Sequence, residues 1–143
     1  MVCTDDRYLK SEGLSLAKIK GCIPVDTAAY DVPKQVASVG GQQAATYTSV
    51  FGADEKSQKE FSPITYVAKD KSIPTFCLLH VGDRPDSAAQ SEAFAKALQD
   101  VGVDATVVPG EGKNHGTINR DLGVEGDKPT KAVFEFLEGL RKK

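Results

Sequence analysis

Two segments of the sequence place residues that could transfer a proton directly after apolar runs. The first is His80-Val81-Gly82-Asp83 and the second is Lys113-Asn114-His115-Gly116. A carboxylate that accepts a hydrogen bond from one imidazole nitrogen fixes the tautomer of the ring and stabilises the imidazolium, while the other nitrogen handles the proton. Asp83 and His115 are therefore candidates for an acid–base pair.

The elements that must position this pair are strands and helices in alternation. Three short apolar runs, bounded by Gly, Pro and Asp, are typical of strands buried on both faces of a parallel sheet. Because the carboxyl ends of parallel strands gather at one edge of a sheet, Asp83 and His115 should meet there. The expected strands span residues 21–25, 74–81 and 105–108, and amphipathic helices are expected over 87–101 and 129–141.

These elements predict an α/β fold with about three parallel strands and flanking helices, in a single domain over residues 1–143. Residues 30–68 are expected to form an irregular excursion with one or two short helices, and residues 2–9 the frayed end of another. Three parallel strands alone leave apolar edges unpaired. We therefore expect either more chain upstream of Met1 or pairing with another copy through the sheet edge.

Composition and charge indicate which kinds of partner and which cellular location are expected for the chain. The net charge is −2 and charged residues make up 27% of the chain, which offers no electrostatic case for nucleic acid. No apolar run approaches the roughly 18 residues of a membrane span. Residues 1–20 are acidic in places and lack the apolar segment of a signal peptide. We expect no nucleic-acid partner, no membrane span and a cytoplasmic location.

The sequence contains 3 cysteines, Cys3, Cys22 and Cys77, and no C-x-x-C pair. Their odd number and wide spacing fit neither a disulfide framework nor a structural zinc site. Cys22 lies beside one apolar run and Cys77 inside another, where a free thiol behaves as a small hydrophobic group. None of them has the flanking glycines that a nucleophile at a strand–helix turn would need. Cys22 and Cys77 are therefore predicted to be inert.

Several other residues of the sequence occur in an order that is seen in a known protein family. In that order a Ser-Pro dipeptide comes first, and a strand that ends in a histidine and an aspartate follows it. These residues are Ser62-Pro63-Ile64, Pro74, His80, Asp83, Gln90-Ser91 and Lys113-Asn114-His115-Gly116, with weaker similarity at Tyr8-Leu9 and at Asp26 to Pro33. With this pattern the chain resembles the C-terminal part of α/β-hydrolase-fold esterases and lipases, in the kynurenine-formamidase or feruloyl-esterase-like branch. The similarity covers nearly the whole chain.

In that family the catalytic triad follows the chain order Ser, Asp or Glu, His. The resemblance implies that Asp83 is the triad acid, that His115 is the general base and that the substrate is a small ester or amide. No G-x-S-x-G occurs; the nearest segment, Gly13-Leu14-Ser15-Leu16-Ala17, lacks the second glycine and follows no expected strand. The glycine-rich oxyanion loop is also missing, since Gly40-Gly41 follows no histidine. The resemblance thus implies a nucleophile upstream of Met1 and an inactive isolated chain.

Other roles remain open for the same residues. Asp86 competes with Asp83 for the acid, although its place at the start of a helix favours an N-cap. His80 is expected to brace its turn by hydrogen bonding. His115 could instead be a loop histidine that caps the segment after it. A metal site from His80, Asp83 and His115 lacks any metal-binding spacing, so no cofactor is predicted.

Two further functions compete with hydrolysis. The first is a non-catalytic α/β module that self-associates, as a homo-oligomer, through its open sheet edge. The second is a flavodoxin-like binding domain, which would need a phosphate-binding loop after the first strand. Asp26-Thr27-Ala28-Ala29 offers no glycine-rich cradle at that place, which disfavours it.

Overall fold

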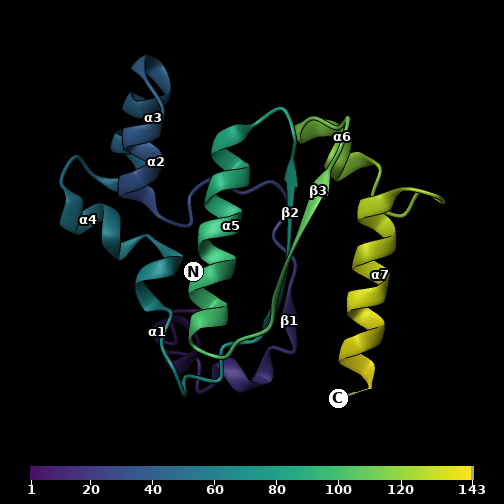
Figure 1. The fold of residues 1–143 in the computed structure, drawn as a ribbon. Helices are drawn as coiled ribbons and strands as arrows, with labels where there is room; N and C mark the ends of the chain where they lie inside the picture. Colours follow the sequence, from purple (N-terminus) through teal and green to yellow (C-terminus); the bar gives the residue numbers. More distant parts are fainter. Residues whose placement is uncertain (143) are drawn as a thin grey trace.

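The computed structural model of the chain describes residues 1–142, and a parallel three-stranded sheet in the order β1-β2-β3 lies at its centre (Figure 1). The predicted α/β fold, with about three parallel strands and flanking helices, is confirmed. The elements are α1 (Arg7–Lys10), the 3-10 helix η1 (Leu16–Lys18), β1 (Gly21–Cys22), α2 (Val32–Ser38), α3 (Gly41–Phe51), α4 (Glu55–Glu60), the 3-10 helix η2 (Pro63–Tyr66), β2 (Thr75–Val81), α5 (Pro85–Asp100), β3 (Ala105–Gly110), α6 (His115–Arg120) and α7 (Lys128–Arg141).

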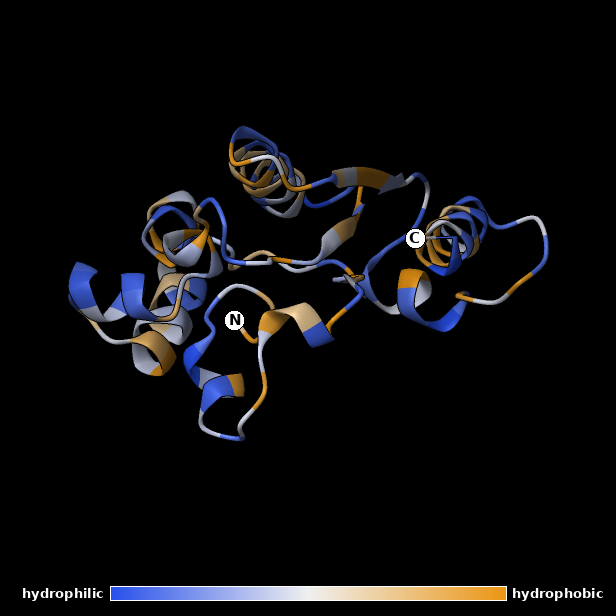
Figure 2. Ribbon diagram, turned by 90° about the horizontal axis from the view of Figure 1, so that it is seen from below, coloured by the Kyte–Doolittle hydropathy of each residue, from blue (hydrophilic) through white to orange (hydrophobic). Residues whose placement is uncertain are grey.

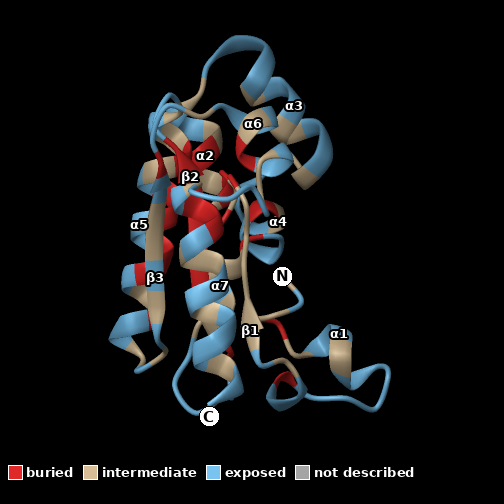
Figure 3. Ribbon diagram, turned by 90° about the vertical axis from the view of Figure 1, so that its right-hand side faces the viewer, coloured by how far each residue is buried: buried red, intermediate tan, exposed pale blue. Residues whose placement is uncertain are grey.

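Strand β2 forms the centre of the core, with α5 and α7 on opposite sides of the sheet (Figures 1 and 2). Hydrophobic residues are concentrated in the strands, and the buried ones gather on β2 and the facing side of α5 (Figure 3). On the α5 side, Phe94 stacks on Tyr30 at 4.6 Å between ring centroids and meets Phe76 edge-on at 5.4 Å. Burial of this apolar surface is the main force holding the layers together.

Strand β1 is shorter than the predicted run of residues 21–25. Only Gly21 and Cys22 pair with β2, and a separate bridge joins Val25 to Leu79. Pro24 between them has no N–H to donate, although its carbonyl still accepts from Leu79 at 3.0 Å. A side chain at Gly21 would lie within 3 Å of the side chains of Phe136 and Leu140 on α7 and would force them to shift, so glycine favours this close approach.

Strand β3 is longer than predicted, because it continues through Pro109 and Gly110 instead of ending before them. An edge strand tolerates proline where the missing N–H would face away from the neighbouring strand. Its register with β2 runs from the pair Phe76 and Ala105 to the pair Val81 and Gly110. The two strands therefore end together, which brings the loops that follow them to one edge.

The helices end and begin where turn and cap residues require. Helix α5 is followed by Gly102, whose φ of +82° is the left-handed conformation expected at that position. Helix α7 starts on the side chain of Asp127, which accepts from the Thr130 N–H at 2.9 Å. On α7 the side chain of Leu137 is 41% exposed.

Residues 30–68 contain more helix than predicted. Three short α-helices and η2 lie on the side of α5 away from α7 (Figure 1). Helix α2 contacts α5, and α3 and α4 pack on α2. At the N-terminus only Arg7–Lys10 is α-helical. None of the described helices is long and apolar enough to cross a membrane.

Candidate active site

The imidazole of His115 contacts the carboxylate of Asp26 at the edge where the strands end. Nδ1 of the ring lies 2.8 Å from Oδ2 of Asp26. Asp26 directly follows the bridge between Val25 and β2, and His115 is the first residue of α6, in the loop region after β3. The predicted meeting of an aspartate and a histidine at this edge therefore occurs, but the aspartate comes from the first strand segment.

The carboxylate of Asp26 is fully buried and is held by donors from several elements. Oδ1 accepts from the Ser87 hydroxyl at 2.7 Å and from the Val81 N–H at 3.3 Å. Oδ2 accepts from Nη1 of Arg84 at 2.9 Å as well as from His115. A buried carboxylate is stable only when its lone pairs are satisfied in this way.

These contacts keep Asp26 ionised. Burial by itself would raise the pKa of this carboxyl group, but the hydrogen bonds from Ser87, His115 and Val81, together with the charge of Arg84, lower it below its ordinary value of 3.8. Because an ionised carboxylate only accepts hydrogen bonds, Nδ1 of His115 must carry the proton in this pair.

The backbone of Asp26 has an uncommon conformation that aims the residue inward. Its φ is +50°, in the left-handed region that aspartate and asparagine tolerate better than most residues. Its N–H donates to the Leu79 carbonyl at 2.7 Å, which ties the turn to β2. Ser87 and Arg84 both come from the start of α5, so the carboxylate lies close to the N-terminus of that helix, where negative charge is favoured.

His115 is placed by a tight turn and a helix cap. Asn114 is the N-cap of α6, and its side chain and that of Thr117 cap each other's backbone N–H at 2.9 and 2.8 Å. A side chain at Gly110 would lie 2.7 Å from Ile118, so glycine permits α6 to fold back onto the end of β3. These features set the start of α6, and with it His115, beside Asp26.

The loop before His115 is anchored by a lysine. Nζ of Lys113 lies 2.6 Å from Oδ1 of Asp127 and 3.1 Å from Oδ2 of Asp121, and its side chain is only 15% exposed. Because Asp127 is also the N-cap of α7, Lys113 joins the histidine loop to the start of the last helix.

The other ring nitrogen of His115 faces outward. The side chain is 64% exposed, and within residues 1–142 Nε2 makes no hydrogen bond. The pair thus has the two properties of a general base: one nitrogen oriented by a buried carboxylate, and one nitrogen accessible to a reacting group.

Asp83, predicted as the acid, lies elsewhere on the same edge. It is exposed in the turn between β2 and α5 and forms no hydrogen bond or ion pair within the described part of the chain. Asp86 is not the helix N-cap; that position is Arg84, and Asp86 accepts from Arg84 at 3.2 Å and from Gln35 at 2.9 Å. His80 is buried, with Nδ1 3.3 Å from the Val81 carbonyl.

Comparisons with protein-family models, with curated proteins and with solved structures find no match to this chain. The site must therefore be interpreted from its own geometry. His80, Asp83 and His115 do not gather as a metal site, since across residues 1–142 no group of three or more His, Cys, Asp or Glu side chains could hold a metal ion.

Sequence reasoning missed Asp26 although the relevant signal was present. Asp26 ends the first apolar run, as Asp83 follows the second, so the strand-end rule applied to both. The order of residues in a family pattern favoured Asp83. What selects Asp26 is the convergence of Ser87, Arg84 and the Val81 N–H on one carboxylate, which spacing along the chain does not reveal.

Proposed function

We propose that this chain supplies the acid and the general base of a serine carboxylesterase- or lipase-type α/β hydrolase that acts on small carboxylic esters or amides. Asp26 is the acid and His115 is the base. The observation that carries the proposal is the 2.8 Å contact between His115 Nδ1 and the buried Asp26 carboxylate, with Nε2 open to solvent at the carboxyl edge of a parallel sheet.

In this reaction Nε2 of His115 accepts the proton of an attacking serine hydroxyl and later donates it to the leaving group. The serine forms an acyl-enzyme, and water activated by the same nitrogen releases the acid product. Asp26 stays ionised and stabilises the imidazolium that forms in each step. The sequence has no G-x-S-x-G motif, so the proposal places the nucleophile in a segment other than these 143 residues.

The test is hydrolysis of a short-chain 4-nitrophenyl ester by the protein expressed from its natural reading frame. His115→Ala and Asp26→Asn should each lower kcat by about 10³–10⁴-fold, because the base is removed or held in the wrong tautomer. Asp83→Asn is the matched control, since this carboxylate is exposed, and should change kcat by less than about twofold.

The same variants distinguish a wrong assignment of the acid from a wrong function. If Asp83→Asn abolishes turnover while Asp26→Asn does not, the acid has been misassigned. If His115→Ala leaves hydrolysis intact, the proposed function is wrong. Strong hydrolysis by residues 1–143 alone that requires His115 would show that the nucleophile lies within the chain.

A structural readout checks the pair without any substrate. Long-range ¹H–¹⁵N NMR at a pH where the ring is neutral should show His115 with the proton on Nδ1. Asp26→Asn should reduce the population of that tautomer, because an amide can donate as well as accept. An Nε2–H tautomer in the wild-type chain would contradict the proposed role of the pair.

The unpaired sheet edges favour a second candidate, a non-catalytic module that self-associates with another copy of this chain. Within the described residues β1 and β3 each pair on one side only, and α7 exposes Phe134 by 56% and Leu137 by 41%. Sedimentation over a range of concentrations would detect such association. A stable oligomer without His115-dependent hydrolysis would favour this candidate over the enzyme.

A further inference from the structure

Two thiols line one cavity at the opposite end of the sheet from Asp26 and His115. Cys22 is the last residue of β1 and pairs with Phe76 near the start of β2. Cys3, from the N-terminal segment, lines the same cavity of about 250 Å³, and both residues pack against the same core cluster. Both cysteines are reduced and only half-buried.

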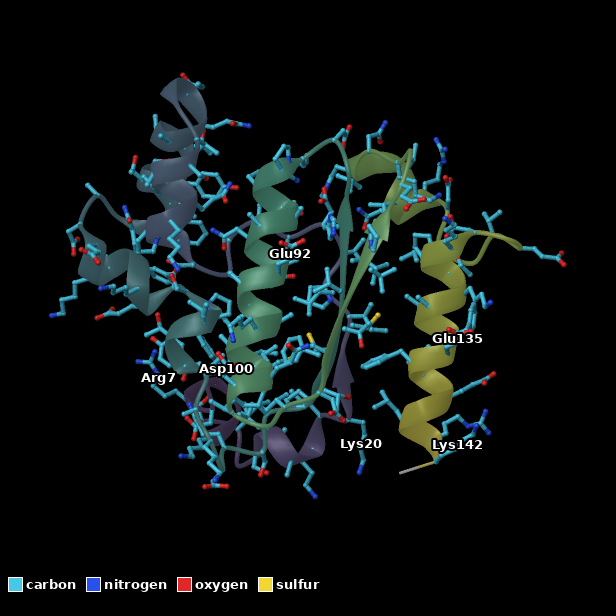
Figure 4. The ribbon with its side chains drawn as sticks, in the orientation of Figure 1. Arg7, Lys20, Glu92, Asp100, Glu135 and Lys142 are labelled. Carbon is cyan, nitrogen blue, oxygen red and sulfur yellow. The ribbon has the colours of Figure 1, made fainter. Side chains whose placement is uncertain are left out.

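The N-terminal segment is held in place, so the proximity of the thiols is built into the fold. Asp5 is 1% exposed and pairs with Arg7 at 2.7 Å. Arg7 (labelled in Figure 4) also donates to the Tyr66 hydroxyl at 2.7 Å. Nζ of Lys71 donates to the Thr4 carbonyl at 3.1 Å. Contacts on both the side chains and the backbone therefore fix the residues next to Cys3.

The contact between the two thiols acts on their pKa values in opposite directions. A hydrogen bond from Cys22 lowers the pKa of Cys3 to about 7, against the opposing effect of burial. The same contact and burial raise the pKa of Cys22. Since the thiolate is the nucleophile in thiol–disulfide exchange, Cys3 is the attacking group near neutral pH. Cys77 is 2% exposed, and burial raises its pKa, so it offers an internal comparison.

We propose that Cys3 and Cys22 form a redox-active dithiol site, which low-molecular-weight disulfides convert into an intramolecular disulfide. From the sequence, Cys22 was predicted to be an inert thiol because it lies beside an apolar run; the fold places it in the same cavity as Cys3. This proposal is independent of the hydrolase function.

The exchange proceeds in two displacements. The Cys3 thiolate attacks one sulfur of the reagent RSSR, forming a mixed disulfide and releasing RS⁻, which takes up a proton. Cys22 then loses its proton and attacks the Cys3 sulfur, which forms the Cys3–Cys22 bond and releases the second RS⁻. In total two protein thiols are oxidised, and one RSSR is reduced to two RSH.

The disulfide would close the loop from residue 3 to residue 22 and attach the N-terminal segment covalently to the strand that leads to Asp26. Cross-linking restricts the unfolded chain, so the oxidised protein should melt at a temperature higher by roughly 5–10 °C.

The test treats the reduced full chain with oxidised glutathione, blocks remaining thiols with N-ethylmaleimide and analyses non-reduced tryptic peptides by mass spectrometry. The expected product links the peptides that contain Cys3 and Cys22, with Cys77 alkylated only after unfolding. Under limiting iodoacetamide, Cys3 should react about tenfold faster than Cys77.

Variants distinguish a paired site from a single reactive thiol. Cys22→Ser and Cys22→Ala should each leave a lasting glutathione adduct on Cys3, and Cys77→Ala should leave the Cys3–Cys22 bond unaffected. A lasting adduct on Cys3 while Cys22 is present, a disulfide between two chains, or no reaction at Cys3 would each overturn the proposal.

Discussion

Two aspartates lie at the same edge of the sheet, Asp26 after the Val25 bridge and Asp83 after β2, yet the two side chains differ in almost every physical respect. Asp26 is buried and accepts from Ser87, Arg84, His115 and the Val81 N–H. Asp83 is exposed on the turn into α5 and has no such partner within residues 1–142. A strand-end position alone therefore does not identify the acid of a site.

The difference arises from where each chain segment goes next. After β2 the chain turns outward to begin α5, and Asp83 lies on that exposed turn. After Val25 the chain turns through the left-handed conformation of Asp26, which directs the carboxylate beneath the N-terminus of α5. Backbone and hydroxyl donors, an arginine and the helix dipole meet there, and together they offset the cost of burying a charge.

The largest expected effect on stability comes from removing the charge at Asp26. Asp26→Asn should lower the free energy of unfolding by about 2–3 kcal/mol, because Arg84 and the other donors lose their buried acceptor charge. Asparagine tolerates the same backbone conformation, so the loss reports on the contacts and not on strain. Urea unfolding followed by circular dichroism measures it.

Asp83→Asn is the matched control for that measurement. An exposed carboxylate without a partner should contribute less than about 0.5 kcal/mol. Equal losses in the two variants would remove the distinction between the two strand ends.

The pH dependence of stability should differ between wild type and Asp26→Asn. The folded-state pKa of Asp26 lies below its unfolded value of 3.8, so its contribution is present above that pH and is lost as the pH falls through the folded-state pKa. The gap between the two urea midpoints should therefore narrow as the pH falls below about 3.8. A gap that widens in acid would show that the pKa is raised instead.

A smaller effect on thermal stability is expected from Lys113, which anchors the loop before His115. Lys113→Met should lower Tm by about 3 °C and reduce esterase kcat severalfold, because the loop before His115 loses its ion pairs with Asp121 and Asp127. Lys128→Met removes an exposed pair with Glu111 and should change Tm by less than about 1 °C. Identical melting of both variants would mean that Lys113 does not hold the loop.

Much of the fold follows from local patterns in the sequence. The apolar runs and the amphipathic patterns over residues 87–101 and 129–141 are local features, and the strands and helices they predicted are present. The boundaries of β1 and β3 were less predictable, because they depend on which side of Pro24 and Pro109 faces a neighbouring strand. Proline is acceptable or disruptive according to that orientation alone.

The sequence by itself determined the alternation of strands and helices and the presence of His115 at the carboxyl edge of the sheet, because periodicity and turn residues act over short distances. Only the tertiary structure decided which carboxylate meets that histidine and which cysteines meet each other. Both pairs join segments far apart in the chain, His115 with Asp26 and Cys3 with Cys22. Such contacts depend on the packing of α5, the loops and the N-terminal segment around the sheet, and neither residue type nor spacing encodes that packing directly.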